Sequence, residues 1–185
     1  MRHNAESDKQ ILELLKTTPE TGLRLLFDVY HMQLCVYAMQ LTDSFSLAED
    51  IVQEFFVSFW EKKYYLNVSG NFRSYLYTSV HNASLAVLKK KRLVSMEELT
   101  GIPVAIPPEP AYDEEGLALR EKELMQKLEK LPRQEIAAIK TVILENKKCV
   151  EAAVELQISV NTLKTHLARG LRKLRKDYNL SLLFY

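Results

Sequence analysis

The densest run of chemically active side chains in this sequence is basic. Residues 164–176 contain six Lys or Arg residues and no Asp or Glu. Such side chains neutralise phosphates, and phosphate contacts supply most of the sequence-independent affinity for nucleic acid. Leucines recur in the same region at spacings of three and four, at positions 163, 167, 171 and 174. This pattern predicts an amphipathic helix with a basic outer face.

A turn and a second helix are predicted just before this basic helix. Ser159 is a suitable N-cap, because its hydroxyl can accept hydrogen bonds from the first turn of the helix. A short helix is expected at about 150–156, so the segment forms a helix-turn-helix. Short polar side chains at the start of the second helix can reach base edges in the major groove, while Lys and Arg further along hold phosphates. A basic helix with a merely solvated face is the alternative interpretation. The predicted duplex-binding residues are Asn161, Thr162, Lys164, Thr165, Arg169 and Arg172.

The rest of the chain is predicted to be helical as well. Apolar residues recur at spacings of three and four over residues 23–41, 51–59 and 72–87, and no useful length alternates with period two. Ser46, with Glu49 three residues later, is predicted to cap the middle one of these helices. The fold class is therefore predicted to be all-α.

Charges are segregated along the chain although the formal net charge is only +1. Residues 1–92 carry a net charge of +1, residues 93–116 of −6 and residues 117–185 of +6. The acidic segment also holds four of the six prolines, which disfavour helices. We therefore expect two helical domains, 1–92 and 117–185, joined by an acidic linker at 93–116. The linker either stays solvated or mimics nucleic acid in a basic channel.

The sequence contains no pattern that indicates an enzyme, a metal site or a cofactor site. The five glycines are too widely spaced for a phosphate-binding loop or a dinucleotide fingerprint. Cys35 and Cys149 have no zinc spacing and form no disulfide framework, which favours a reduced, cytoplasmic protein. His31 and Cys35 lie one turn apart, but no third ligand is evident, so ordinary packing explains them. We expect no metal, no cofactor, no small-molecule substrate and no enzymatic activity.

Three motifs together resemble bacterial sigma factors of the extracytoplasmic-function (ECF) class. Residues 48–60 (AEDIVQEFFVSFW) resemble the polymerase-binding helix of that family. Residues 72–77 (FRSYLY), followed by Asn82 and the basic run 89–92, resemble its promoter-melting segment. Leu131-Pro132, then Glu151-Ala152-Ala153 and residues 159–164 (SVNTLK), resemble its helix-turn-helix. The resemblance runs from about residue 23 to residue 176.

This resemblance implies a function and a set of partners. A sigma factor binds core RNA polymerase and directs promoter-specific transcription initiation, and an anti-sigma factor is a further expected partner. The second domain would read the minus-thirty-five promoter element as duplex DNA. The polymerase-binding residues would be Asp50, Gln53 and Glu54, which are expected to share one side of their helix.

The first domain would melt the minus-ten element and hold it as a single strand. Single strands bind to aromatic stacking platforms and cationic tracks. The loop after residue 61 and the basic run 89–92 offer side chains of both kinds. The predicted single-strand residues are Tyr64, Tyr65, Asn67, Asn71, Arg73, Lys89, Lys90 and Arg92.

Two other functions are compatible with the sequence. A stand-alone helix-turn-helix regulator would bind duplex DNA as a dimer, and a helical adaptor would bind only a protein partner. The basic run 89–92 and the loop aromatics favour the sigma factor over the regulator. Three residues depart from the family pattern. Ala152 stands where the family usually has Ile, in Glu151-Ala152-Ala153, and is a smaller core residue. Gln157 stands where the turn usually has Gly or Asn, and Gly170 lies inside the basic helix, where glycine costs about 1 kcal/mol relative to alanine.

Overall fold

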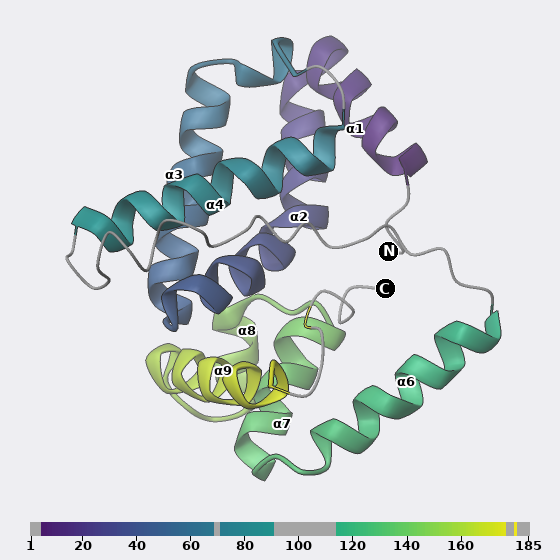
Figure 1. Ribbon diagram of the computed structural model, residues 1–185, viewed down its shortest axis with the longest axis vertical. Helices are drawn as coiled ribbons and strands as arrows, with labels where there is room; N and C mark the ends of the chain where they lie inside the picture. Colours follow the sequence, from purple (N-terminus) through teal and green to yellow (C-terminus); the bar gives the residue numbers. More distant parts are fainter. Residues whose placement is uncertain (1–4, 69–70, 91–113, 177–179, 181–185) are drawn as a thin grey trace.

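Helices make up the architecture wherever the structure describes the chain, which is at residues 5–68, 71–90, 114–176 and 180. In these ranges the computed structural model contains helices and no strand, which confirms the all-α class. Helices α1 to α4 form one body, and α7 to α9 form a second body against one end of the first (Figure 1). Helix α6 extends beside the second body. None of the described helices has the length and apolar character of a membrane span.

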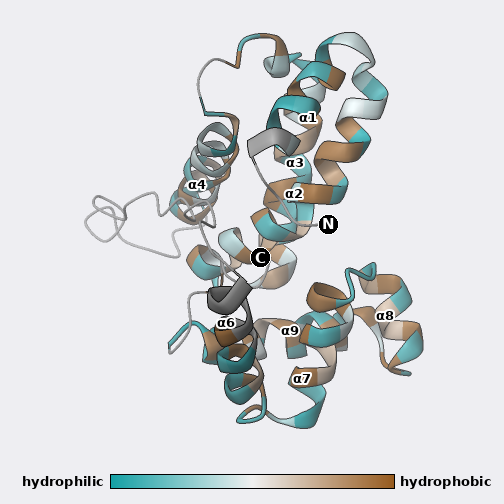
Figure 2. Cartoon of the chain, turned by 90° about the vertical axis from the view of Figure 1, so that its right-hand side faces the viewer, coloured by the Kyte–Doolittle hydropathy of each residue, from teal (hydrophilic) through white to brown (hydrophobic). Residues whose placement is uncertain are grey.

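The first body is organised around α2. Residues 33–39 of α2 are buried on every side, because α1, α3 and α4 pack around this helix and the second body touches it near its C-terminal end. The spacing of apolar residues predicted that one face of this helix would be buried. Between positions 33 and 39, all faces are buried. Hydrophobic and hydrophilic residues alternate along the helices of this body (Figure 2). The elements of this body are α1 (Ala5–Thr17), α2 (Pro19–Thr42), α3 (Phe45–Glu61), the 3-10 turn η1 (Tyr64–Leu66) and α4 (Phe72–Lys90).

The second body packs α7 and α8 against α9. Gly170 lies where α9 approaches α7: an added Cβ would lie 2.8 Å from Cδ1 of Ile139 and 3.2 Å from Cβ of Glu135. Glycine lowers the helix propensity at this position, but it allows α9 and α7 to approach closely. A larger residue would disturb this contact. The elements are α6 (Glu114–Leu128), α7 (Arg133–Ile139), the π-helical turn η2 (Lys140–Leu144), α8 (Cys149–Glu155) and α9 (Val160–Leu174).

Helix α6 begins at Glu114, within the segment 93–116 that we expected to be linker. Residues 93–113 of that segment lie outside the described residues, as do the tail positions 177–179 and 181–185. Leu180, in that tail, is buried.

The N-terminus of α3 differs from the sequence prediction. Ser44, and not Ser46, is the N-cap: its Oγ accepts a hydrogen bond from the backbone N–H of Leu47 at 3.3 Å. The prediction of Ser46 was wrong because Phe45 belongs to the helix and is buried in the core, which sets the helix start one residue before Ser46. Ser46 lies exposed in the first turn.

This difference gives a direct test. We expect Ser44→Ala to lower the free energy of unfolding by about 1 kcal/mol, because the first turn of α3 loses its side-chain acceptor. Ser46→Ala removes the same hydroxyl from an exposed helical position and serves as the matched control, with a change within about 0.5 kcal/mol. Urea unfolding followed by circular dichroism measures both. A larger loss for Ser46→Ala than for Ser44→Ala would contradict this cap assignment.

The crossing of α1 and α2 requires glycine at position 22. An added Cβ on Gly22 would lie 2.7 Å from the backbone carbon of Leu14 and 2.7 Å from Cα of Leu15. These neighbours are backbone atoms, which cannot rotate away as the end of a side chain can. Residue spacing does not indicate this contact, because it depends on where the two helices meet.

We therefore expect Gly22→Ala to destabilise the protein by about 2 kcal/mol, although alanine is the better helix former. Thr21→Ala, at the exposed neighbouring position, is the control and should change the free energy of unfolding by no more than about 0.7 kcal/mol. Thermal and urea unfolding of both variants measures the difference. An increase in stability for Gly22→Ala would show that α1 is not held at this distance.

Candidate nucleic-acid interface

Helix α9 has the cap and the rotation that its sequence predicted. The Oγ of Ser159 accepts a hydrogen bond from the backbone N–H of Thr162 at 3.0 Å. The turn before it places Gln157 in the left-handed region, at φ 54°, so this position adopts the conformation that glycine or asparagine usually takes. The inner side of α9 is buried through Leu163, Leu167, Leu171 and Leu174.

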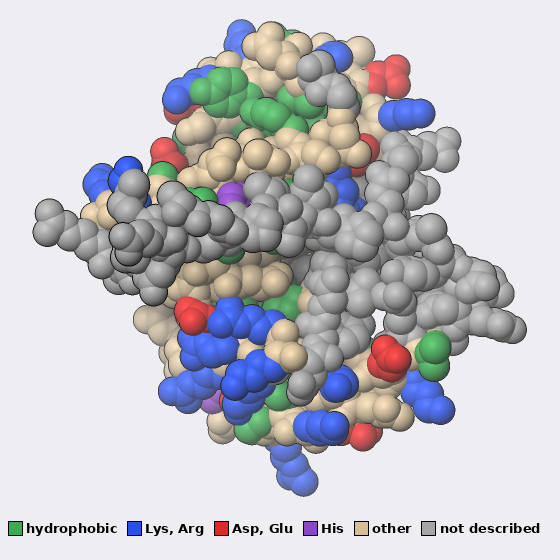
Figure 3. Space-filling view, in the orientation of Figure 1, with side chains coloured by type: hydrophobic (Ala, Val, Ile, Leu, Met, Phe, Trp, Pro, Cys, Tyr) green, Lys and Arg blue, Asp and Glu red, His purple; other side chains and the backbone are tan. Residues whose placement is uncertain are grey.

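Burial of the leucines turns a polar row of α9 to solvent. Asn161, Thr162, Thr165 and Arg169 are exposed, as predicted for residues that reach a duplex. The hydroxyl of Thr165 donates to the backbone oxygen of Asn161 at 2.8 Å, which leaves its oxygen free to accept from a ligand. Lys and Arg side chains gather over the region of α9 in the space-filling view (Figure 3). The arrangement fits a helix that enters a groove of DNA by its outer side.

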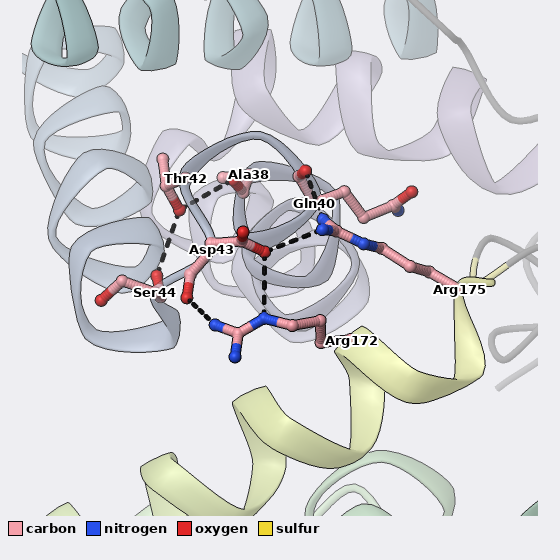
Figure 4. Close-up of polar contacts among 7 residues, drawn as sticks. All are labelled: Ala38, Gln40, Thr42, Asp43, Ser44, Arg172 and Arg175. Atoms are coloured by element: carbon pink, nitrogen blue, oxygen red, sulfur yellow. Dashed lines mark hydrogen bonds and ion pairs between the residues drawn. The ribbon is translucent and has the colours of Figure 1, made fainter. Parts of the chain in front are cut away.

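Lys164 and Arg172, the other two predicted duplex-binding residues, face the first body instead. Lys164 forms an ion pair with Glu49 of α3, and this hydrogen bond raises the pKa of Lys164. Arg172 donates from Nε to Oδ1 of Asp43 at 3.2 Å and from Nη2 to the backbone oxygen of Asp43 at 2.8 Å (Figure 4). Neither side chain is fully exposed. Four of the six predicted duplex-binding residues are therefore open to solvent, and the other two are held by the first body.

The predicted single-strand residues that are accessible fall into two groups on the first body. Tyr64 and Asn67 are exposed around η1, and Asn71 is exposed where α4 begins and caps it through the backbone N–H of Ser74, at 2.8 Å. Lys89 and Lys90 are exposed in the last turn of α4. The 19 residues of α4 separate the two groups by about 28 Å along the helix.

Two predicted single-strand residues are buried, so their side chains are not accessible to a strand in this structure. Tyr65 is only 5% exposed, and its ring packs on Phe59 and Trp60 with centroids 5.9 and 6.1 Å apart. Arg73 is 1% exposed, and its guanidinium lies over the ring of Tyr77 at 5.5 Å. Both positions fall on the inner side of their element, which the residue types alone do not indicate. Arg92 lies outside the described residues.

The three predicted polymerase-binding residues are all exposed on α3, but they do not share one side. Asp50 and Glu54, one turn apart, line a groove of about 470 Å³ between α3 and α4. Gln53 lines a different hollow, together with Glu49 of α3 and Val150 of α8. The expectation of a common side was wrong because residues 53 and 54 lie about 100° apart around a helix.

The pair His31 and Cys35 is part of the packing of α2. Cys35 Sγ lies 3.7 Å from Nε2 of His31, whose ring stacks on Phe27 with centroids 4.2 Å apart. Burial lowers the pKa of His31 and raises the pKa of the Cys35 thiol. Among the described residues, no group of three His, Cys, Asp or Glu side chains is placed to hold a metal ion.

Comparisons with known proteins agree with this arrangement of helices. The family model of sigma-70 region 2 matches residues 26–94, and the family model of sigma-70 region 4 matches residues 121–174. The chain is also similar to the ECF RNA polymerase sigma factor SigL of Mycobacterium tuberculosis, in strains H37Rv, CDC 1551 and Erdman. It is 26% identical to SigL over 157 residues, which cover 83% of this chain and 86% of SigL.

The chain belongs to the ECF sigma factors. It therefore directs promoter-specific transcription, and the family to which it belongs binds core RNA polymerase and promoter DNA. Sigma factors are non-catalytic initiation factors, so the chemistry of transcription belongs to the polymerase. The region 2 match covers most of α2 and all of α3 and α4, and the region 4 match covers about half of α6 and all of α7 to α9. Helix α1 lies outside both matches.

Sequence reasoning missed the residues through which the two bodies of this sigma factor meet. Asp43 and Glu49 from the first body hold Arg172 and Lys164, and Arg175 donates from Nη1 to the backbone oxygen of Gln40 at 2.8 Å. Arg172 and Asp43 are 129 residues apart, so no local pattern links them. The net charges of the segments did not indicate this contact either, because the first 92 residues are close to neutral as a whole.

Proposed function

We propose that the two bodies of this sigma factor divide promoter recognition between them. Residues 117–185 read the minus-thirty-five element as duplex DNA through α9. Residues 1–92 bind core polymerase through α3 and hold the melted minus-ten element as a single strand, and residues 93–116 join the two domains. The observation that carries this proposal is the exposed polar row of α9, with its capped N-terminus and buried leucines.

The polar row of α9 has side chains for both parts of duplex recognition. Asn161, Thr162 and Thr165 lie in the first two turns, where short side chains reach base edges in the major groove. Arg169 follows one turn later and is long enough to reach a phosphate. Lys164 and Arg172 join them once they leave their acidic partners in the first body.

The single-strand site we propose on the first body combines an aromatic platform with cationic groups. Tyr64 is 40% exposed, and Nζ of Lys62 lies 5.8 Å from the centre of its ring. An unstacked base and a phosphate would find a stacking surface and a positive charge side by side there. Asn67 and Asn71 supply polar groups near the same end of α4. Lys89 and Lys90 would hold the backbone at the other end.

The polymerase contact we propose uses both exposed sides of α3. Asp50 and Glu54 place two carboxylates at the rim of an apolar groove, which fits a partner with basic and apolar side chains. Gln53 contributes a neutral amide on the neighbouring side. We also propose an anti-sigma factor as a regulatory partner, on the resemblance to the ECF class, and a cytoplasmic location, because the polymerase acts there.

Removal of Arg169 tests the duplex-binding row. We expect Arg169→Ala to weaken binding about five- to tenfold and to reduce the slope of log affinity against log salt by about one, because one phosphate contact is lost. The probe is a duplex promoter selected from a random pool with this chain and core polymerase. Arg133→Ala, at an exposed position of α7 in the same body, is the matched control. Equal affinities and slopes for the two variants would show that this row does not contact DNA.

Removal of the Gln53 amide tests the polymerase contact. We expect Gln53→Ala to weaken association with core polymerase about fivefold while its circular dichroism spectrum matches that of the wild type, because the residue is exposed. Glu61→Ala, at the exposed end of the same helix, is the control. Titration of labelled core polymerase gives the dissociation constants. An unchanged constant for Gln53→Ala would remove this side of α3 from the contact.

A further inference from the structure

An acidic corner of the first body holds one side of α9. We define this corner as the carboxylates of Asp43 and Glu49 together with the backbone oxygens of Gln40 and Asp43. Arg172 donates to both the carboxylate and the backbone oxygen of Asp43. Arg175 contacts the same carboxylate oxygen through Nη2 at 2.9 Å and also donates to the backbone oxygen of Gln40 (Figure 4).

The end of α2 makes this corner resemble a nucleic-acid backbone. The last carbonyl groups of a helix have no partner within the helix, and they form the negative end of its dipole. Asp43 is the C-cap of α2 and adds a full negative charge at that end. Guanidinium groups pair with carboxylates and phosphates through the same forked geometry. Arg172 and Arg175 therefore find on α2 the chemistry that a phosphate would offer them.

Glu49 provides a second attachment point for α9. Its side chain is only 13% exposed, so its ion pair with Lys164 is better shielded from salt than the contacts of Asp43. Lys164 and Arg172 are eight residues apart, which is about 2.2 turns, so they point about 80° apart around the helix axis. The two attachments thus fix α9 along its length against the end of α2 and the start of α3.

We propose that the acidic corner is an internal competitor of promoter DNA. In the free chain it occupies Lys164 and Arg172, and these side chains reach a duplex only after α9 leaves the first body. The inference rests on the proposed function of α9 as the duplex reader. A closed form of this kind lowers the apparent affinity for DNA by the fraction of molecules that are open.

The test neutralises the corner in the full-length protein. Asp43→Asn with Glu49→Gln removes both charges, and asparagine tolerates the left-handed backbone at position 43, where φ is 54°. Glu13→Gln with Glu61→Gln makes the same change in net charge at exposed positions that take no part in the corner. The probe is a fluorescent 20-base-pair duplex of random sequence, titrated at low salt, and small-angle X-ray scattering gives the radius of gyration.

We expect the corner variant to bind the duplex about three- to tenfold more tightly than the control variant and to show a larger radius of gyration. Arg169→Ala, introduced into both the wild type and the corner variant, should weaken binding in each. If the corner variant loses helix content, Asp43→Asn alone is used, because that side chain is 53% exposed. Its expected gain in affinity is about twofold.

Two results would overturn the proposal, and they are distinguishable. If Arg169→Ala weakens binding but the corner variant has the affinity and radius of gyration of its control, the corner only packs the two bodies together, and the proposed function stands. If Arg169→Ala has no effect in either background, α9 is not the duplex reader. The proposed function then fails, and the internal competitor fails with it.

Discussion

Burial of the leucine row of α9 sets the arrangement of the second body. Leu163, Leu167, Leu171 and Leu174 must leave water together, and this sets the rotation of the helix about its axis. With the rotation fixed, every other side chain of α9 has a determined direction. Gly170 permits the required approach to α7. One apolar contact thus decides which polar residues of this sigma factor face outward.

The polar residues of α9 fall into two groups in the closed chain. Asn161, Thr162, Thr165 and Arg169 are exposed to solvent, whereas Lys164 and Arg172 are held by the acidic corner. In a basic helix without a partner, the positive side chains would repel one another and would attract polyanions non-specifically. Acidic groups on the first body neutralise part of the positive charge of α9. Because the Asp43 contacts are largely exposed, salt or a competing polyanion can weaken them.

The first body shows where residue type is a poor guide to function. Tyr65 and Arg73 have the side chains that single-strand binding needs, yet both are buried, because their backbone positions face the core. Tyr64 and Lys62, next to Tyr65, are the accessible pair. Asp50, Gln53 and Glu54 are accessible as expected, but they lie on two sides of α3. The motifs lie on helices of the structure, while burial and rotation decided which of their residues are accessible.

The helices, the capped helix-turn-helix and the family could be predicted from residue types and spacings alone. These depend on contacts within a few residues of one another, such as the hydrogen bond from Thr162 to Ser159, and on spacings along a single helix. Three features could be found only from the packing of the helices: the burial of Arg73, the need for glycine at position 22 and the pairing of Arg172 with Asp43. Each of these depends on how separate helices meet in space, and residue spacing along one helix does not record where another helix will pack.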